Sequence, residues 1–408
     1  MDFSTIQNDD LRRFLSGMTN ADGVSPWTSD KELIRLLDIL LAEAEPQGVV
    51  VLRDWLTRFN TALASAHVDT ASEIAVLDTL LDKTAGRAQA LERVIQTSRE
   101  RLGTLYEARR DWVAAARVLQ GISLETGQGV VSPNDKVQIY TRIARCYLSA
   151  NDLGQAETFA KRAANYLFVD TTPAALQREY RLVQADILNA QCKFLEAFRK
   201  YYDVSLLKEE EWNSDRAFQQ AIKCAVLAGV GNQRTQALAT LCDDPRTAMT
   251  PYAEWLNRLY QVRYIPPTKY SELKGMMHHL MSTYTTENLT TDDTLVTNAL
   301  IEHNLVALSR VYATVTVDRL AVVLGNLSVD QTALLVSRLI TQGALRAGID
   351  DTQGVVYFDT LDQVAKGMFP DTGEPQRQNR TALQRACEKV DVLAEEIQRC
   401  WPQLARQV

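Results

Sequence analysis

The stretch that decides the fold is 102–119, with the sequence LGTLYEARRDWVAAARVL. The same arrangement returns at a constant offset of 41 residues, as IARCYLSANDLGQAETFA at 143–160 and QADILNAQCKFLEAFRKY at 184–201. Each copy is typical of the end of one amphipathic helix, a short polar turn and the start of a second helix. Five apolar columns recur without a gap: Leu105/Cys146/Ile187, Tyr106/Tyr147/Leu188, Trp112/Leu153/Phe194, Ala115/Ala156/Ala197 and Leu119/Ala160/Tyr201.

Repeated helical hairpins predict a mostly α-helical chain that forms a right-handed solenoid, similar to tetratricopeptide and HEAT arrays. We expect the Ala column to let two antiparallel helices approach closely. The large residue three positions earlier, Trp112 in the first copy, is expected to insert as a wedge into the facing groove. One hairpin cannot bury its apolar stripe alone, so the copies must stack. A weaker fourth copy is expected around 223–241.

The overall composition supports long helices. The 408 residues include Gly 18 and Pro 11, roughly 7% together against about 12% in ordinary proteins. Lys+Arg 44 and Asp+Glu 51 give a net charge of −7, which disfavours a protein that binds phosphate backbones. Residues 1–14 lack the apolar run of a signal peptide, and the longest apolar stretches are too short for a bilayer. The six Cys do not suggest a disulfide framework. We therefore expect a soluble chain in a reducing compartment, without a membrane partner.

The pattern changes after residue 295, where short elements replace the long helices. Their order, helix, strand, two helices and hairpin, is that of a winged helix. The polar, Thr-rich stretch 283–294 is expected to be a loop before it. The predicted elements are an amphipathic helix at 300–312, a β-branched run at 314–317, a helix at 318–324, a helix from Ser328 to Gly343 with a capping box, and a hairpin of 345–349 and 355–359.

A helical-repeat array followed by a winged helix and a C-terminal helix is similar to the PCI-domain subunits of large complexes. These complexes are the proteasome lid, the COP9 signalosome and translation initiation factor three. The resemblance is strongest to the signalosome branch and covers roughly residues 85–362, whereas 283–294 departs from it. It is carried by DWVAAARVLQGISLETGQ at 111–128, IARCYL at 143–148, QRTQALATL at 233–241 and IEHNL at 301–305.

The resemblance implies three domains and a non-catalytic scaffold role. The domains are a helical-repeat arm at 1–295, a winged helix at 296–362 within a PCI module of about 197–362, and a tether with a C-terminal bundle helix at 363–408. The signalosome removes the ubiquitin-like modifier NEDD8 from cullin-RING ubiquitin ligases through a separate metalloprotease subunit. This chain is expected to help receive the cullin-RING end and to contact other PCI and MPN subunits, in the cytoplasm and nucleus. The alternatives are a PCI subunit of the proteasome lid or of factor three.

A winged-helix protein that binds nucleic acid is the alternative from another class. Phosphate contacts need clustered Lys and Arg, and the expected recognition helix from Ser328 offers one Arg. Between Thr316 and Asp359 acidic residues outnumber basic ones, so the charge opposes nucleic acid as a partner. The residues counted are Arg319, Arg338 and Arg346 against Asp318, Asp330, Asp350, Asp351 and Asp359.

No catalytic, metal or cofactor motif is found among the polar residues. The adjacent pair His278-His279 points to different faces of a helix and chelates poorly. We expect the triplet Glu302-His303-Asn304 to hydrogen-bond backbone and to fix how the solenoid meets the wing. Cys146, Cys192 and Cys224 are expected on apolar helical faces as small buried side chains.

Two partner-binding surfaces are predicted instead. The second strand of the hairpin is expected to form a free sheet edge for a neighbouring PCI subunit. The C-terminal helix carries apolar residues spaced by three or four positions, which is typical of a seam that packs on other helices. The residues of the two surfaces are Val355, Val356, Tyr357 and Phe358 in the wing, and Leu383, Ala386, Val390, Leu393, Ile397 and Trp401 in the helix.

Overall fold

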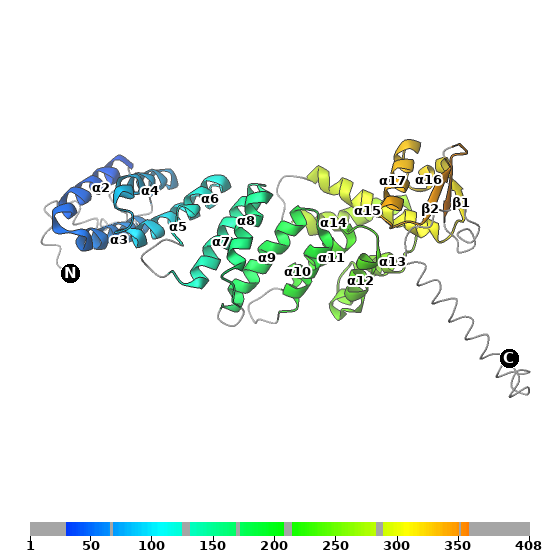
Figure 1. The fold of residues 1–408 in the computed structure, drawn as a ribbon, viewed down its shortest axis with the longest axis horizontal. Coiled ribbons are helices and arrows are strands. Elements are labelled where there is room, and N and C mark those ends of the chain that lie inside the picture. The colour runs from blue at the N-terminus through cyan, green and yellow to red at the C-terminus, as the bar shows by residue number, and fades with distance from the viewer. Residues whose placement is uncertain are drawn as a thin grey trace, which may run out of the picture. The chain divides into compact units, whose positions relative to one another are not determined.

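The structure is a computed structural model that describes residues 30–65, 68–124, 131–168, 172–207, 214–282, 289–350 and 352–358. The chain divides into two compact units, Met1–Ala228 and Gly229–Val408. Both are mainly helical, as the sequence predicts (Figure 1). The boundaries predicted at 295 and 362 remain predictions.

The first unit is a stack of antiparallel helices, which follow one another from α2 to α11 in Figure 1. Their inward faces form continuous apolar clusters, in which Leu37, Phe59 and Leu77 are fully buried. The helices are α2 (Asp30–Ala44), α3 (Val49–Ser65), α4 (Thr70–Thr84), α5 (Glu92–Ala108), α6 (Trp112–Gln120), α7 (Pro133–Ser149), α8 (Leu153–Ala164), α9 (Ala174–Ala190), α10 (Phe194–Ser205) and α11 (Ser214–Leu227).

The predicted repeat is confirmed by an identical turn in three hairpins, α5–α6, α7–α8 and α9–α10. In each turn one residue adopts the left-handed conformation, and the next backbone N–H donates to the carbonyl five residues earlier. This geometry closes a helix without a long loop. The left-handed residues are Arg110 (φ 61°), Asn151 (φ 61°) and Cys192 (φ 59°). The hydrogen bonds, each 2.9 Å, are Asp111 N to Tyr106 O, Asp152 N to Tyr147 O and Lys193 N to Leu188 O.

The apolar columns match the packing in part. Ala115, Ala156 and Ala197 are all fully buried, as expected for a close helix approach. The wedge expectation for Trp112 is wrong in degree, because its side chain is only partly buried, at the first position of α6. The expectation for Cys192 is also wrong: the residue lies in the turn itself and is exposed.

A helix–turn–helix is present at the expected fourth copy, but its connection differs. α11 ends at Leu227 and α12 (Asn232–Asp243) begins after a link that contains Gly229 and Gly231. Neither glycine adopts the left-handed conformation. The turn shared by the three other copies is therefore missing here.

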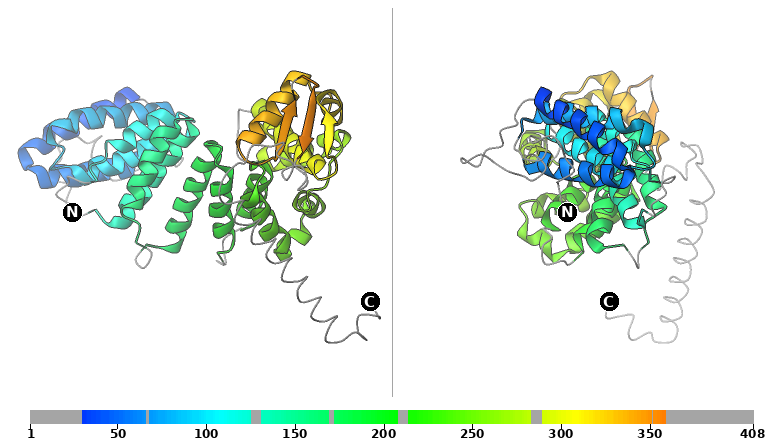
Figure 2. Two further views of the ribbon diagram at one scale, coloured as in Figure 1. Left: turned by 45° about the vertical axis from the view of Figure 1, so that its right-hand side comes forward. Right: turned by 90° about the vertical axis from the view of Figure 1, so that its left-hand side faces the viewer.

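The second unit continues with helices and then the elements of a winged helix (Figure 2). The prediction that the Thr-rich stretch 283–294 is a loop is wrong for its second half, because α15 begins at Leu289. The Ser328 capping box with Gln331 and the left-handed Gly343 (φ 69°) are confirmed. After α12 come α13 (Ala253–Tyr260), α14 (Tyr270–Ser282), α15 (Leu289–Ser309), β1 (Thr314–Thr316), α16 (Val317–Val323), α17 (Val329–Thr341), β2 (Ala347–Asp350) and β3 (Val355–Phe358).

The three strands form one antiparallel sheet in the order β1-β3-β2. Val356 of β3 lies opposite Val315 on one side and Ile349 on the other. The expectation that 355–358 is a free edge is therefore wrong, since β3 is the central strand. The hairpin itself is confirmed, but the third strand, 314–316, adds to β3 from a distance in sequence and covers the edge that the hairpin alone would leave open.

Candidate functional site

Residues 355–358 of the predicted wing surface alternate between two environments. Val356 and Phe358 are fully buried, whereas Val355 and Tyr357 are partly buried. The strand therefore stabilises the wing and offers no unpaired ladder. The other predicted surface, Leu383, Ala386, Val390, Leu393, Ile397 and Trp401, lies outside the described residues.

The open edge of the sheet is β1. Val317 N donates to Gly354 O and Phe358 N donates to Ala313 O, both at 2.8 Å. Because paired residues alternate along an antiparallel ladder, Val315 faces β3 and the backbone groups of Thr314 and Thr316 face away from it. Both Thr side chains are exposed. Such an edge can accept the backbone of an added strand.

The opposite edge, β2, is less open. By the same alternation its outward backbone groups belong to Ala347 and Ile349. Ala347 is buried and Ile349 is partly buried. A partner strand therefore has easier access to β1 than to β2.

Asn304 lies at the centre of a buried polar junction in the second unit. Its Oδ1 accepts from Ile265 N (2.9 Å), and its Nδ2 donates to Ile265 O (2.6 Å) and to the Tyr270 hydroxyl (2.7 Å). The side chain is fully buried. One amide thus satisfies both backbone groups of Ile265, which lies between α13 and α14, and ties that segment to α15.

His303 and Glu302 extend the junction on either side. His303 Nε2 lies 2.9 Å from Arg263 O, while Glu302 forms an ion pair with Arg338 of α17. Burial, with a smaller contribution from Arg234, lowers the pKa of His303 to about 4, so the ring is neutral at pH 7. Burial likewise lowers the pKa of Arg234 to about 10. The predicted hydrogen bonding of the triplet to backbone is confirmed, and the three residues tie α15 to the segment before α14 and to α17.

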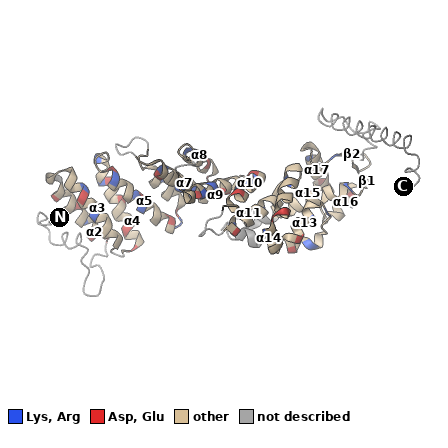
Figure 3. Cartoon of the chain, turned by 90° about the horizontal axis from the view of Figure 1, so that it is seen from below, with Lys and Arg blue, Asp and Glu red and all other residues tan. Residues whose placement is uncertain are grey.

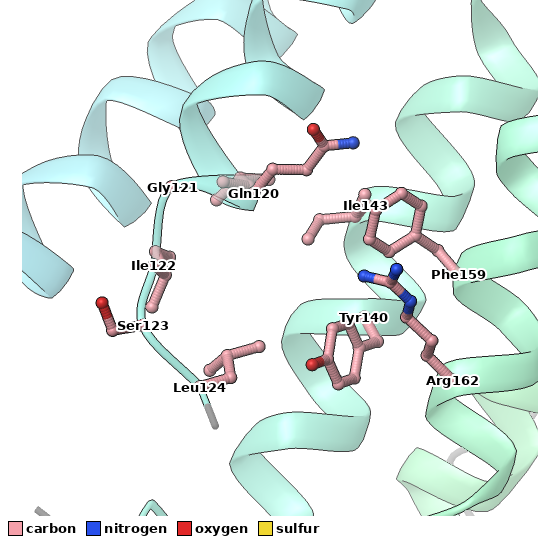
Figure 4. Close-up of a pocket in the computed structure, with 10 residues that line it drawn as sticks. Gln120, Gly121, Ile122, Ser123, Leu124, Tyr140, Ile143, Phe159 and Arg162 are labelled. Atoms are coloured by element: carbon pink, nitrogen blue, oxygen red, sulfur yellow. The ribbon is translucent and has the colours of Figure 1, made fainter. Parts of the chain in front are cut away.

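The first unit contains a surface cavity of about 540 Å³ that the sequence reasoning missed (Figure 4). The chain after α6 forms one wall, and side chains of α7 and α8 form the other. The lining residues of the first wall, 119–124, all belong to the stretch 111–128 that carries the family resemblance. The lining residues are Leu119, Gln120, Gly121, Ile122, Ser123, Leu124, Tyr140, Ile143, Phe159 and Arg162. We refer to it as the arm cavity.

The described residues show little that suits catalysis. They contain no group of three or more His, Cys, Asp or Glu placed to hold a metal ion, and the side chains of His278 and His279 lie outside them. Burial raises the pKa of Cys146 and of Cys224 to about 12 each, so both thiols are protonated and poor nucleophiles. Among the described helices, none is both long and apolar enough to cross a membrane.

Comparison with protein families gives two matches along the chain. The family described as PSMD12/CSN4, N-terminal, matches residues 26–211, and the PCI domain matches residues 286–360. The first match includes the repeated hairpins and the arm cavity. The second includes α15, with Glu302, His303 and Asn304 of the polar junction, and the three strands.

The chain is similar to COP9 signalosome complex subunit 4 of several organisms. The subunit of Emericella nidulans is 34% identical over 339 residues, which is 81% of this chain and 80% of the relative. The Drosophila melanogaster subunit is 31% identical over 86% of this chain and 88% of the relative. The Arabidopsis thaliana subunit is 29% identical over 80% and 81%. The chain therefore belongs to the family of COP9 signalosome complex subunit 4.

Proposed function

We propose that this chain is a non-catalytic scaffold subunit of the COP9 signalosome. The observation that carries the proposal is the 34% identity to a subunit 4 over 81% of the chain, which spans both the repeats and the PCI match. In this proposal the complex removes NEDD8 from cullin-RING ligases in the cytoplasm and nucleus. The bond is cut by a separate metalloprotease subunit.

The two described units suit different parts of this role. Stacked hairpins present an extended surface, which solenoids commonly use to hold a large partner. The proposal assigns reception of the cullin-RING end to this surface. The winged helix and the C-terminal segment 363–408 contact other PCI and MPN subunits.

Affinity purification with mass spectrometry tests the assignment. Recovery of signalosome subunits with the tagged full-length chain supports the proposal. Recovery of proteasome-lid or factor-three subunits in their place would show that the alternative PCI complexes are correct.

The non-catalytic part of the proposal has its own test. The purified chain is expected to leave NEDD8-modified cullin uncut, with or without added zinc, because no metal-ligand pattern is found in its sequence. Turnover by the isolated chain that a chelator abolishes would contradict this part.

Assembly through the sheet is tested at the β1 edge. Thr314→Pro removes an N–H that faces away from β3, so it leaves the β1–β3 ladder intact. We expect it to weaken incorporation into the complex. Ile349→Pro is the matched control, since it removes the corresponding outward N–H of β2. Normal incorporation of Thr314→Pro would exclude strand addition at β1.

Assembly through the C-terminal segment is tested by deletion of residues 381–408. We expect the truncated chain to keep its melting temperature but to lose stable incorporation, as a helix packed on other subunits requires. A large drop in the melting temperature of the isolated chain would instead show that the segment packs on its own chain.

A further inference from the structure

An aromatic cluster lies between α7 and α8 beside the arm cavity. Tyr140 packs on Phe159 and on Tyr166, with both pairs of ring centroids 6.2 Å apart, and Tyr147 stacks on Phe159 at 5.7 Å. Tyr140 and Phe159 also line the cavity. The cavity therefore has an aromatic wall, the kind of surface that holds an apolar anchor side chain.

Two cations lie over this cluster. Arg162 Cζ is 5.0 Å from the Phe159 centroid, and Lys136 Nζ is 4.8 Å from the Tyr166 centroid. Cation–π contact orients both side chains but leaves their hydrogen-bond donors available. Figure 4 shows the Arg162 guanidinium beside Phe159, on the wall opposite the chain of Gly121, Ile122 and Ser123.

A third cation, Arg99 of α5, packs on the other wall. A Cβ atom at Gly121 would lie 1.6 Å from Arg99 Nη1. Gly121 has an ordinary φ of −68°, so the backbone does not require glycine there. The missing side chain makes room for the guanidinium against the wall that Gly121 forms. Burial lowers the pKa of Arg99.

Several other basic residues of the same helices form ion pairs. Arg142 donates to both carboxylate oxygens of Glu107 (2.7 and 3.1 Å), and Arg145 pairs with Glu179 (2.7 Å). Figure 3 shows basic and acidic residues interspersed along this unit. By contrast, Arg99, Lys136 and Arg162 make no ion pair within the part of the chain that the structure describes. Arg162 thus lines the cavity itself, whereas Arg99 contacts its wall at Gly121 and Lys136 lies over Tyr166 of the adjoining aromatic cluster, in a chain of net charge −7.

From this juxtaposition we infer that the arm cavity binds an acidic, extended peptide segment of a partner protein. An apolar side chain of the segment packs against Tyr140 and Phe159, and flanking carboxylates pair with Arg162, Lys136 and Arg99. A volume of about 540 Å³ accommodates such an anchor with its flanking residues. The inference goes beyond the proposed scaffold role and does not depend on it.

The test uses the purified full-length chain and three fluorescein-labelled heptapeptides. The sequences are EEDFDEE, EEDGDEE without the anchor, and KKRFRKK with inverted charge. We expect EEDFDEE to bind best in fluorescence anisotropy, and binding to weaken with salt. Arg162→Glu is expected to weaken it at least about tenfold, because a pairing cation becomes a repelling anion. Arg99→Gln and Lys136→Glu are expected to weaken it less.

Arg53→Glu is the matched control, because Arg53 is exposed on α3 of the same unit and the charge change is identical. It is expected to leave peptide binding unchanged.

A version of the EEDFDEE peptide with a photoreactive phenylalanine is expected to crosslink within 119–124 or 140–162. The inference is overturned if KKRFRKK binds as well, if Arg162→Glu matches Arg53→Glu, or if crosslinks map elsewhere. The inference is also overturned if the chain self-associates and Arg162→Glu abolishes this self-association without affecting peptide binding. The occupant of the cavity would then be a second copy of the chain. Signalosome recovery in the pull-down is unaffected by these outcomes.

Discussion

In the first unit, three helical hairpins are closed by the same turn, with a left-handed residue at Arg110, Asn151 and Cys192. In the second unit, α15 is held to the segment before α14 by a buried polar junction at Asn304 and His303. Each turn contains the same backbone hydrogen bond, between residues five positions apart. The junction occurs once and joins residues 34 to 40 positions apart.

This difference predicts how damage spreads in each unit. A solenoid is stabilised by packing within each hairpin and between adjacent hairpins. A local defect therefore weakens one hairpin and its immediate neighbours. A buried junction concentrates its energy in few atoms, and each atom left unsatisfied carries a full desolvation cost. The variants below test the contrast, beginning with the largest expected effect.

Asn304→Ala is expected to destabilise the second unit by about 3–5 kcal/mol, because Ile265 and the Tyr270 hydroxyl lose buried partners. Hydrogen exchange followed by mass spectrometry is expected to show loss of protection in α13–α15 and none in α5–α10. Asn257→Ala, at an exposed position of α13, is the control and is expected to change little. Loss of protection in both units would contradict the contrast.

Ala156→Leu is expected to cost about 2–3 kcal/mol, because the fully buried Ala column has no room for a larger side chain. Exchange is expected to rise in α7–α10 and to leave α2 and α3 protected. Ala164→Leu, at the exposed end of α8, provides the control. Equal effects of the two variants would refute close packing at the Ala column.

The junction is expected to weaken at mildly acidic pH. The pKa of His303 is lowered from 6.5 to about 4, so the unfolded chain takes up the proton first as the pH falls. The stability that neutral His303 contributes is present above about pH 6.5 and is lost as the pH falls toward 4, by about 2 kcal/mol at pH 5. Hydrogen exchange of α15 at pH 7.5 and 5, corrected for intrinsic rates, measures this. In His303→Gln the dependence is expected to flatten, and an unchanged slope would contradict the assignment.

Cys192→Gly is expected to stabilise the third repeated hairpin by about 0.5–1 kcal/mol, because glycine adopts φ 59° without steric cost. Asn151→Gly is the comparison at the equivalent position of the second repeated hairpin, and it is expected to gain less stability, since Asn tolerates this conformation better. Urea unfolding followed by circular dichroism detects the difference. A lower free energy of unfolding in Cys192→Gly would contradict this. It would show that the Cys192 side chain stabilises the fold by more than the left-handed backbone destabilises it.

The parts of the fold that could be predicted from the sequence depend on local patterns. The 41-residue offset repeats the helix ends and turn residues, and the Ser328 capping box and Gly343 mark the limits of α17. The position of β1 in the sheet could not be predicted, because Thr314–Thr316 pairs with residues about 40 positions later. A hairpin pattern alone leaves both of its outer edges equivalent.

The candidate sites show the same limit. The triplet 302–304 stands out as polar residues on an amphipathic helix, but its partners Ile265 and Arg338 are set by tertiary packing. The arm cavity has no sequence signature, because Arg99, Lys136 and Arg162 come from three different helices. That none of them forms an ion pair with another described residue becomes apparent only once the helices are packed.

The central position of β3 has a consequence for how the chain survives before assembly. Its sequence, VVYF, is the type of β-prone, uncharged segment that promotes aggregation when its backbone is free. In the folded wing both of its ladders are occupied, and the strands at the margins are the short TVT and AGID. The hazard is thereby confined to unfolded or newly synthesised chains, so closure of this small sheet protects a subunit that waits for its partners.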